Sequence, residues 1–426
     1  MHLFRKASGV FKTTFRSLQY RNFRYFWFGQ CISLIGTWMQ RTAQVWLVYS
    51  ITKSPLLVGI LGVCQFTPTL LFTLFAGVLV DHFSKKHILI FTQAMFMLQA
   101  VAMTALTYTG RIQYWHILVL SAVFGLTQTI DMPARQSFFI DMVGKKDVMN
   151  AVSLNSTIVN VAKIVGPAVS GIIMVKYGPV FCFFVNACSY IAVIFGICMM
   201  RTPAVSTHRA AQRMGPEIME GVRYVRRNEV LMMNVILTAV VCTFAMNNDV
   251  IIPVFSKTVL GQGAGGYTGL MSAAGVGAFI GAVLMAFISK NGLNKSILII
   301  DGIATAAIQI ATLFTRSYAV SLILIGIVGF INLTFINTAN SIFQVYSTDQ
   351  YRGRVMSVYS FLVMGSTPIG NYFAGSVMES LGGDSGFVIG GIVTLAIVIP
   401  YLIVKRKVAI EWLRAGRESY ELSKAS

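Results

Sequence analysis

Charged residues are scarce in this sequence of 426 residues, and acidic residues are the scarcest. Only 12% of positions are charged, and 15 Asp and Glu stand against 34 Lys and Arg. A soluble chain of this length would need charged surfaces around two or three separate cores. Instead 55% of the residues are apolar, the mean hydropathy is +0.70, and apolar runs of about 20 residues recur from end to end. The composition therefore predicts an integral membrane protein.

Motifs for catalysis, metal binding and nucleotide binding are also lacking. No G-x-x-x-x-G-K-[ST] occurs, so we do not expect ATP to be the energy source. The segment "GQGAGG" (261–266) satisfies G-x-G-x-x-G, but it lies in a predicted outer loop without a βαβ unit. The five histidines are scattered and the six cysteines are dispersed, mostly within apolar runs. We therefore expect no enzyme activity, no cofactor, no metal site and no disulfide framework.

The apolar runs predict an all-α integral membrane fold with twelve transmembrane helices. They lie near 24–50, 55–80, 87–109, 114–141, 148–176, 179–200, 230–259, 267–289, 294–314, 318–346, 353–380 and 386–404. An even number of crossings puts both termini on the same side of the membrane.

The distribution of basic residues predicts which side that is. Of the 34 Lys and Arg, 26 lie in the amino-terminal segment, the even-numbered loops and the tail. Basic residues accumulate in cytoplasmic loops, so we expect a plasma (inner) membrane protein with both termini cytoplasmic. The net charge of +19 then follows from topology and from attraction to anionic lipid headgroups, and it needs no nucleic-acid partner.

The polar segments divide the chain into five parts. We predict a basic cytoplasmic segment (1–23) lying on the membrane surface, a six-helix bundle (24–200), a cytoplasmic linker with a surface helix after Pro216 (201–229), a second six-helix bundle (230–404) and a cytoplasmic tail (405–426). The second half echoes the first: "GVLVDHFSKKHILI" (77–90) recurs loosely as "GAVLMAFISKNGLNKSILI" (281–299). Two halves in parallel repeat favour a secondary transporter with a binding site between them near the bilayer midplane.

One loop resembles a known family. In "GVLVDHFSKKHIL", Gly77, Asp81, Lys85 and Lys86 are similar to the loop signature of the major facilitator superfamily between helices 2 and 3, with Ser84 where glycine is usual. The resemblance implies the fold of that superfamily, two pseudo-symmetric six-helix bundles, and a role of these residues in gating. It places Asp81 against the start of the helix at 353–380, where a carboxylate is favourable at the positive dipole end.

Two further stretches narrow the resemblance. "AKIVGPAVSG" (162–171) is similar to the helix-5 signature of drug:proton antiporters, matching at Gly166, Pro167 and Gly171, where it implies a bend; Ala162 and Ser170 replace glycines. "LIGTWMQRTAQVWLVYSITKSP" and "IDMPARQSFFIDMV" resemble the secretion-effector subgroup, which includes the enterobactin exporter and macrolide efflux pumps. The resemblance implies a proton-coupled exporter, which we expect to be a monomer.

Two cations lie within predicted spans, where a charge is costly enough to suggest function. Arg41 belongs to a polar stripe on the first helix that also carries Thr37 and Gln44, at helical spacing. Lys163 lies about 20 Å into the fifth helix at 1.5 Å per residue. With Asn337, these four residues form the predicted substrate-binding cavity. The cations favour a substrate with negative or electron-rich oxygens on an amphipathic body.

Three buried acids are candidates for other roles. Asp131 and Arg135 are spaced i, i+4, so they can pair, either as a static ion pair or as a gate latch. Asp249 in "NND" is the first candidate for proton coupling and Asp131 the second, with a polar kink before Pro253 as the alternative reading of Asp249. Asp301 heads a stripe with Thr305, Gln309 and Thr312, which we interpret as helix packing.

Together these features predict a secondary active transporter, a proton-coupled exporter of an amphipathic, siderophore-like or drug-like molecule that works by alternating access. The alternative is a lysophospholipid or metabolite importer, or a flippase, of the same fold. A channel is disfavoured because no filter or gate repeats along the chain.

Overall fold

The computed structural model describes residues 15–200, 214–288 and 292–414. Within these ranges the side chains of Leu74, Gly77, Val78, Asp81 and residues 214–218 lie outside the description. The predicted surface segment at 1–23, the linker at 201–229 and the tail at 405–426 therefore fall partly outside the described residues.

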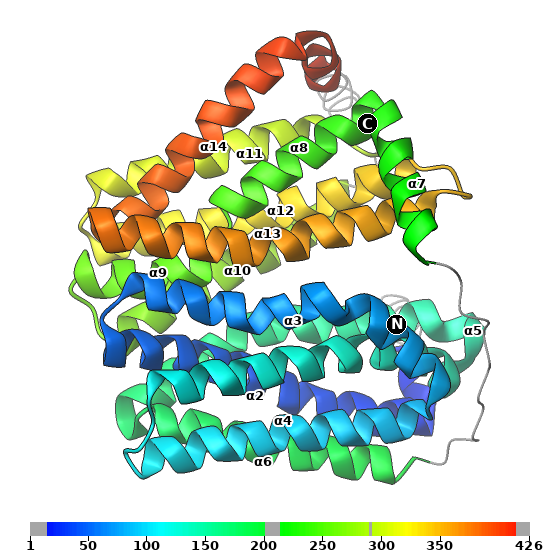
Figure 1. Cartoon of the computed structure of the whole chain (residues 1–426), viewed down its shortest axis with the longest axis vertical. Coiled ribbons are helices and arrows are strands. Elements are labelled where there is room, and N and C mark those ends of the chain that lie inside the picture. The colour runs from blue at the N-terminus through cyan, green and yellow to red at the C-terminus, as the bar shows by residue number, and fades with distance from the viewer. Residues whose placement is uncertain (1–14, 201–213, 289–291, 415–426) are drawn as a thin grey trace, which may run out of the picture. The chain divides into compact units, whose positions relative to one another are not determined.

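The described chain is helical and contains no strand, so the all-α fold predicted from the sequence is confirmed (Figure 1). The first elements are η1 (Arg16–Gln19), α2 (Arg21–Thr52), α3 (Pro55–His82), α4 (Lys85–Tyr108), α5 (Tyr114–Tyr177) and α6 (Pro179–Cys198). After the linker come α7 (Met214–Arg227), α8 (Glu229–Phe244), α9 (Asn248–Thr258), α10 (Ala264–Ile288), α11 (Ser296–Ala311), η3 (Thr312–Phe314), α12 (Tyr318–Val345), α13 (Arg352–Leu381) and α14 (Ser385–Val404).

Nine helical segments among the described residues are long and apolar enough to cross a membrane. This set leaves out α2, α7 and α13, counts α5 once, and counts α8 with α9 and α11 with η3 as single spans. With 64 residues, α5 would be about 96 Å long at 1.5 Å per residue, roughly three times the thickness of a hydrocarbon core. Gly144 interrupts it with φ 73° and ψ 169°. Residues that carry a side chain rarely adopt this backbone conformation. The element is therefore two helices, as the sequence predicted, while the total of twelve crossings stays a prediction.

The predicted helix at 230–259 is present as one candidate membrane span, Glu229–Thr258, but it is interrupted. It consists of α8, which ends at Phe244, and α9, which begins at Asn248. The interruption includes the first residue of the "NND" cluster and does not lie at Pro253, which stands inside α9. The surface helix expected after Pro216 is present as α7, which begins at Met214.

The contacts divide the chain into two units. Unit 1 comprises Met1–Gln44 and Leu71–Ala211, and unit 2 comprises Val45–Leu70 and Gln212–Ser426. In unit 2 the backbones of α3, in its first half, and α13 are in close contact at Gly59. A Cβ at this glycine would lie 2.4 Å from the carbonyl oxygen of Asn371. The predicted division into bundles at 24–200 and 230–404 stays a prediction.

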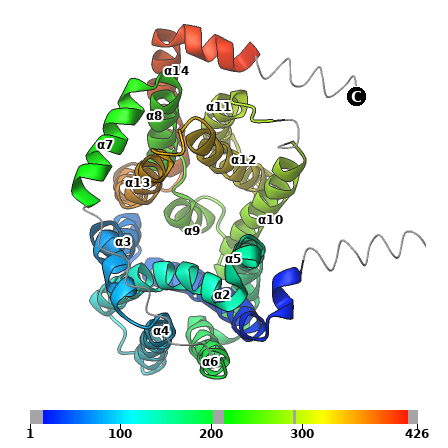
Figure 2. The same ribbon diagram turned by 90° about the vertical axis from the view of Figure 1, so that its right-hand side faces the viewer.

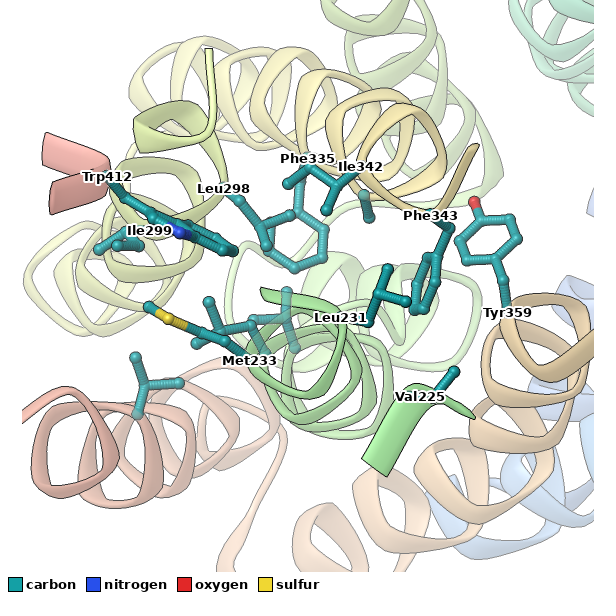
Figure 3. Close-up of a cluster of buried hydrophobic side chains, with 14 of the residues drawn as sticks. Val225, Leu231, Met233, Leu298, Ile299, Phe335, Ile342, Phe343, Tyr359 and Trp412 are labelled. Atoms are coloured by element: carbon teal, nitrogen blue, oxygen red, sulfur yellow. The ribbon is translucent and has the colours of Figure 1, made fainter. Parts of the chain in front are cut away.

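The largest core of unit 2 joins helices that are distant in the sequence. Leu231 of α8, Leu298 of α11 and Phe335 of α12 belong to one buried cluster, and Trp412 from the short helix after α14 covers it (Figure 3). Asn228 begins α8, because its side-chain oxygen accepts from the backbone N–H groups of Val230 and Leu231 at 3.0 and 3.2 Å. The cluster fixes how α8, α11 and α12 present their polar residues to one another.

In unit 1 the corresponding core packs the start of α2 against the middle of α5. Phe23 and Phe26 are buried against Phe139 with edge-to-face ring geometry at 6.1 and 5.9 Å. Figure 2 shows α4 beside α6, which the contacts between these helices confirm. These packings hold α2, α4, α5 and α6 together around the buried polar residues of unit 1.

Candidate functional site

The two cations of the predicted cavity face the same aromatic ring in unit 1. The guanidinium carbon of Arg41 lies 5.1 Å from the centre of the Trp38 ring, and Nζ of Lys163 lies 5.6 Å from it. Arg41 and Trp38 are on α2, whereas Lys163 is on α5. Each cation over an indole face gains about 0.5–2 kcal/mol. The sequence indicated both cations, but only the packing of α5 on α2 shows that Trp38 joins them.

Small residues on α5 explain how the two helices approach so closely. A Cβ at Gly166 would lie 2.5 Å from the Trp38 Cβ and 3.0 Å from the Met39 nitrogen. One turn later Ser170 Oγ donates to the Met39 carbonyl at 3.2 Å, and Gly171 is buried. The helix continues through Pro167, and the bend expected here stays a prediction. The motif acts here as a contact surface for α2 (small-residue packing).

The other two polar residues of the stripe on α2 are engaged in helix packing. Thr37 Oγ1 lies 3.1 Å from the Tyr190 hydroxyl of α6 and donates to the Ser33 carbonyl at 2.9 Å. Gln44 is 7% exposed and donates through Nε2 to Ser121 Oγ of α5 at 2.5 Å. In this structure their polar groups bond to neighbouring helices of unit 1, so their role toward a substrate stays a prediction.

Asp131 and Arg135 form the ion pair that their spacing predicts. Arg135 Nε donates to Asp131 Oδ2 at 3.0 Å, and Nη2 contacts the same oxygen. The other carboxylate oxygen of Asp131 accepts from Thr92 Oγ1 at 2.7 Å and from Gln93 Nε2 at 2.9 Å, both on α4. Both carboxylate oxygens of Asp131 are therefore bound, one to Arg135 and the other to two neutral donors of α4.

The basic pair of the loop signature binds within unit 1. Lys85 pairs with Asp141 of α5 at 2.8 Å, and Lys86 Nζ donates to the carbonyl of Met200 at 2.6 Å, just beyond the end of α6. A cation at the end of a helix satisfies carbonyls that lack intrahelical partners. The side chains of Gly77 and Asp81 lie outside the description, and the gate contact expected for Asp81 stays a prediction.

The break between α8 and α9 was missed by the sequence analysis, and it is the site of the Asp249 candidate. Asn247 is 2% exposed, and its Nδ2 donates to the Thr243 carbonyl at 2.7 Å. Gln309 of α11 donates through Nε2 to the Ala245 carbonyl at 2.6 Å. These amides satisfy carbonyls that the interruption removes from the helix ladder. Asp249 lies in the first turn of α9, where the helix dipole favours negative charge.

Asn337, the fifth residue of the predicted cavity, and Asp301, the third acidic candidate, lie on neighbouring helices of unit 2. Asn337 is half-buried on α12, and its carbonyl accepts from Ser341 Oγ at 2.8 Å. Asp301 on α11 is 8% exposed, and Thr334 Oγ1 of α12 donates to its Oδ2 at 2.5 Å. The stripe headed by Asp301 therefore contacts a neighbouring helix, as the packing interpretation expected. The described residues contain no group of three or more His, Cys, Asp or Glu able to hold a metal ion.

Known proteins extend these findings. The model of the transmembrane secretion effector family matches residues 12–414, and the related chains are transporters of the major facilitator type. The helical fold and the polar residues buried between its helices thus define a multi-pass membrane transporter of the major facilitator superfamily. Within it, the chain belongs to the transmembrane secretion effector family.

Three relatives have names that indicate different substrates. The chain is 21% identical over 390 residues to a staphyloferrin A transporter of Staphylococcus aureus, covering 91% of this chain and 97% of the relative. It is 24% identical over 380 residues to the multidrug efflux pump Tap of Mycolicibacterium fortuitum, covering 87% and 90%. It is 19% identical over 396 residues to macrolide efflux protein A of Streptococcus pyogenes, covering 90% and 96%.

Solved transporters share the fold. The nucleoside transporter NupG matches with a TM-score of 0.74 at 10% identity, covering 90% of this chain and 98% of that one. A bacterial homologue of the human lysosomal transporter Spinster matches with a TM-score of 0.68 at 13% identity, covering 94% and 98%. Identities this low support the fold and no more.

Proposed function

We propose that the chain is a proton-driven exporter that moves an amphipathic organic molecule with anionic or electron-rich oxygens out of the cell by alternating access. It acts in the plasma membrane as a monomer with both termini in the cytoplasm. The arrangement that carries the proposal is the indole of Trp38 facing Arg41 and Lys163. An aromatic face beside two cations suits a body that is partly aromatic and carries carboxylate, phosphate or catecholate oxygens.

The relatives support export over import. A staphyloferrin A transporter, a multidrug efflux pump and a macrolide efflux protein match most of this chain. The names of these relatives indicate different substrates, but each relative matches this chain over most of its length. We infer that the direction of transport follows the family and that the residues around Trp38 select the substrate.

Transport across inverted membrane vesicles tests this proposal. Inverted vesicles place the cytoplasmic face outside, so an exporter concentrates its substrate in the lumen when the lumen is acidic. We expect accumulation of labelled staphyloferrin A or of a macrolide under an imposed pH gradient, and its loss when a protonophore collapses the gradient. Accumulation only in right-side-out vesicles would instead support the importer.

Asp249 is the first candidate for the coupling carboxylate in this proposal, and Asp131 is the second. Asp249 lies in the first turn after the break between α8 and α9, and interrupted helices of this kind form the substrate and ion sites of many transporters. Asp249→Asn should still exchange substrate across the membrane at equal pH but should not concentrate it. If this variant concentrates substrate under a pH gradient as the wild type does, the coupling site lies elsewhere.

A further inference from the structure

Asp301 differs from the other two buried acids of known geometry, Asp131 and Asp147, in having no cation beside it, since Asp147 pairs with Arg16 at 3.1 Å. Among the described residues the Asp301 carboxylate has one hydrogen-bond partner, Thr334 Oγ1 at 2.5 Å, and no ion pair. Asp131, in contrast, is bonded to Arg135 and to two neutral donors. Since an isolated buried carboxylate is far costlier than a paired one, the surroundings of Asp301 accommodate the neutral acid better than the anion.

The helices packed on α11 supply no counter-charge along their length. Figures 1 and 2 show α11 beside α8, α12 and α14, and its contacts are with these helices and η3. Neither α12 nor α14 contains an Asp, Glu, Lys, Arg or His, and α8 has only Glu229, at its first residue. Glu229 is exposed and pairs with Lys405 at 2.9 Å. The other titratable groups of these helices are Cys242 of α8, Tyr318 at the start of α12 and Tyr401 of α14.

The nearest cation in the sequence, Lys295, is engaged at the beginning of α11. Its Nζ lies 5.1 Å from the centre of the Tyr346 ring and 5.7 Å from that of Trp412, and 3.5 Å from Glu411 Oε1. Six residues separate Lys295 from Asp301, about 9 Å along a helix. The next residue of α11, Gly302, faces apolar side chains, because a Cβ there would lie 3.3 Å from Val241 Cγ2 and 3.6 Å from Phe335 Cε2.

A row of buried polar side chains extends from Asp301 along α11. Thr305 and Gln309 follow at intervals of four residues, and both are 0% exposed. Thr305 Oγ1 lies 3.5 Å from Asn332 Oδ1, and Gln309 donates to the Ala245 carbonyl at the break between α8 and α9. The row therefore spans about 12 Å at 1.5 Å per residue and ends where the helix of Asp249 begins.

One atom of this row has hydrogen-bonding capacity left. Oε1 of Gln309 is buried and has no hydrogen-bond partner among the described residues. A buried amide oxygen can accept a hydrogen bond from a proton-carrying group or a water. Helix packing is already served by the hydrogen bond from Thr334 to Asp301 and the one from Gln309 to Ala245. It does not account for the Oε1 of Gln309 left without a partner in the described part of the chain.

We propose that Asp301 is a proton-binding site of the transport cycle, in addition to Asp249, and that the polar row of α11 connects it with the break between α8 and α9. The inference rests on the proposed proton-driven export. One proton enters from the outer side, binds a carboxylate oxygen of Asp301 to give the neutral acid, and leaves to water at the cytoplasmic end of α11. Charge and atoms balance, since one proton crosses and the carboxylate is regenerated.

Infrared difference spectroscopy of the full chain in lipid nanodiscs tests proton binding without any substrate. Spectra between acidic and alkaline pH should contain the C=O band of a buried carboxylic acid. Asp301→Asn should remove this band, whereas the same change at Asp384, whose carboxylate lies 4.0 Å from the Arg316 guanidinium and has no part in the proposal, should retain it. Thr334→Val should shift its frequency because the hydrogen bond is lost, and Thr305→Val, the matched change on α11, should not. A spectrum of Asp301→Asn identical to that of the wild type would overturn the proposal.

Reconstituted vesicles test whether this proton is coupled to transport. With labelled staphyloferrin A and a macrolide as probes, Asp301→Asn should reduce accumulation driven by a pH gradient by about tenfold or more, and exchange at equal pH should stay within about twofold of the wild type. Wild-type accumulation by this variant would refute coupling through Asp301. If the wild type transports neither probe under any gradient, the proposed exporter function fails, and the infrared band still decides whether Asp301 binds a proton.

Discussion

Arg135 and Asp131 are bound to each other one turn apart on α5, and the carboxylate of Asp131 is also bound to Thr92 and Gln93 of α4. The pair is largely buried, with side-chain exposures of 15% and 6%. Such a pair gains little over apolar packing, but removing one partner leaves an uncompensated charge. The arrangement therefore stabilises unit 1 only while both partners are present.

Asp131→Asn should destabilise the protein strongly. Breaking a buried pair costs about 3–5 kcal/mol, so we expect a clear fall in the melting temperature of the purified protein. The double variant Asp131→Asn with Arg135→Gln should recover part of the loss, because neither charge is then left alone. Equal melting temperatures of the single variant and the wild type would show that the pair acts as a weak latch.

Gly166→Ala should disrupt the contact between α5 and α2. The added Cβ would lie 2.5 Å from the Trp38 Cβ and 3.0 Å from a backbone nitrogen, so the helices must separate. Overpacking of this kind costs about 1–3 kcal/mol. Gly353→Ala on α13 is the matched control, since nothing lies within 4 Å of its Cβ, and it should leave the melting temperature unchanged or raise it. Similar losses in both variants would argue against the contact.

The pairing of Glu229 with Lys405 predicts a dependence on alkaline pH. The hydrogen bond from Lys405 to the Glu229 carboxylate raises the pKa of Lys405 above its ordinary value of 10.5. A raised pKa means that the stabilisation is fully present below the ordinary value and is lost as the pH rises through the higher one. Thermal unfolding between neutral and strongly alkaline pH should show this loss in the wild type, and Glu229→Gln should not. The effect should shrink in high salt because the pair is exposed.

The sequence predicted those features that depend on residues close together in the chain. The apolar runs indicated the helices, and the i, i+4 spacing indicated the pair of Asp131 and Arg135, because both depend on neighbours along one helix. The break between α8 and α9 was missed because apolar residues continue on both sides of it. Its amide partner, Gln309, comes from α11, 64 residues away from Ala245.

The surroundings of Asp301 could not be predicted from the sequence for a related reason. Its sequence neighbours describe a polar stripe, and a stripe predicts packing equally well. Only the tertiary structure shows that Thr334, 33 residues away, is its one hydrogen-bond partner among the described residues and that the adjoining helices have no cation along their length. The contact of Trp38 with Lys163 likewise depends on how α5 packs on α2, which the sequence does not show.

The cations around Trp38 predict how substrates should be selected. Arg41→Gln and Lys163→Gln should each weaken transport of an anionic probe by about tenfold and that of a neutral macrolide by less, because charge-assisted bonds to the substrate are lost. Trp38→Phe should keep part of the activity that Trp38→Ala loses. Lys176→Gln, the same change at the exposed end of α5, should have no effect on either probe. Initial rates in reconstituted vesicles measure these differences. Equal losses for both probes, or strong export of a permanently cationic dye by the wild type, would show that Arg41 and Lys163 serve the fold or the gate and not recognition.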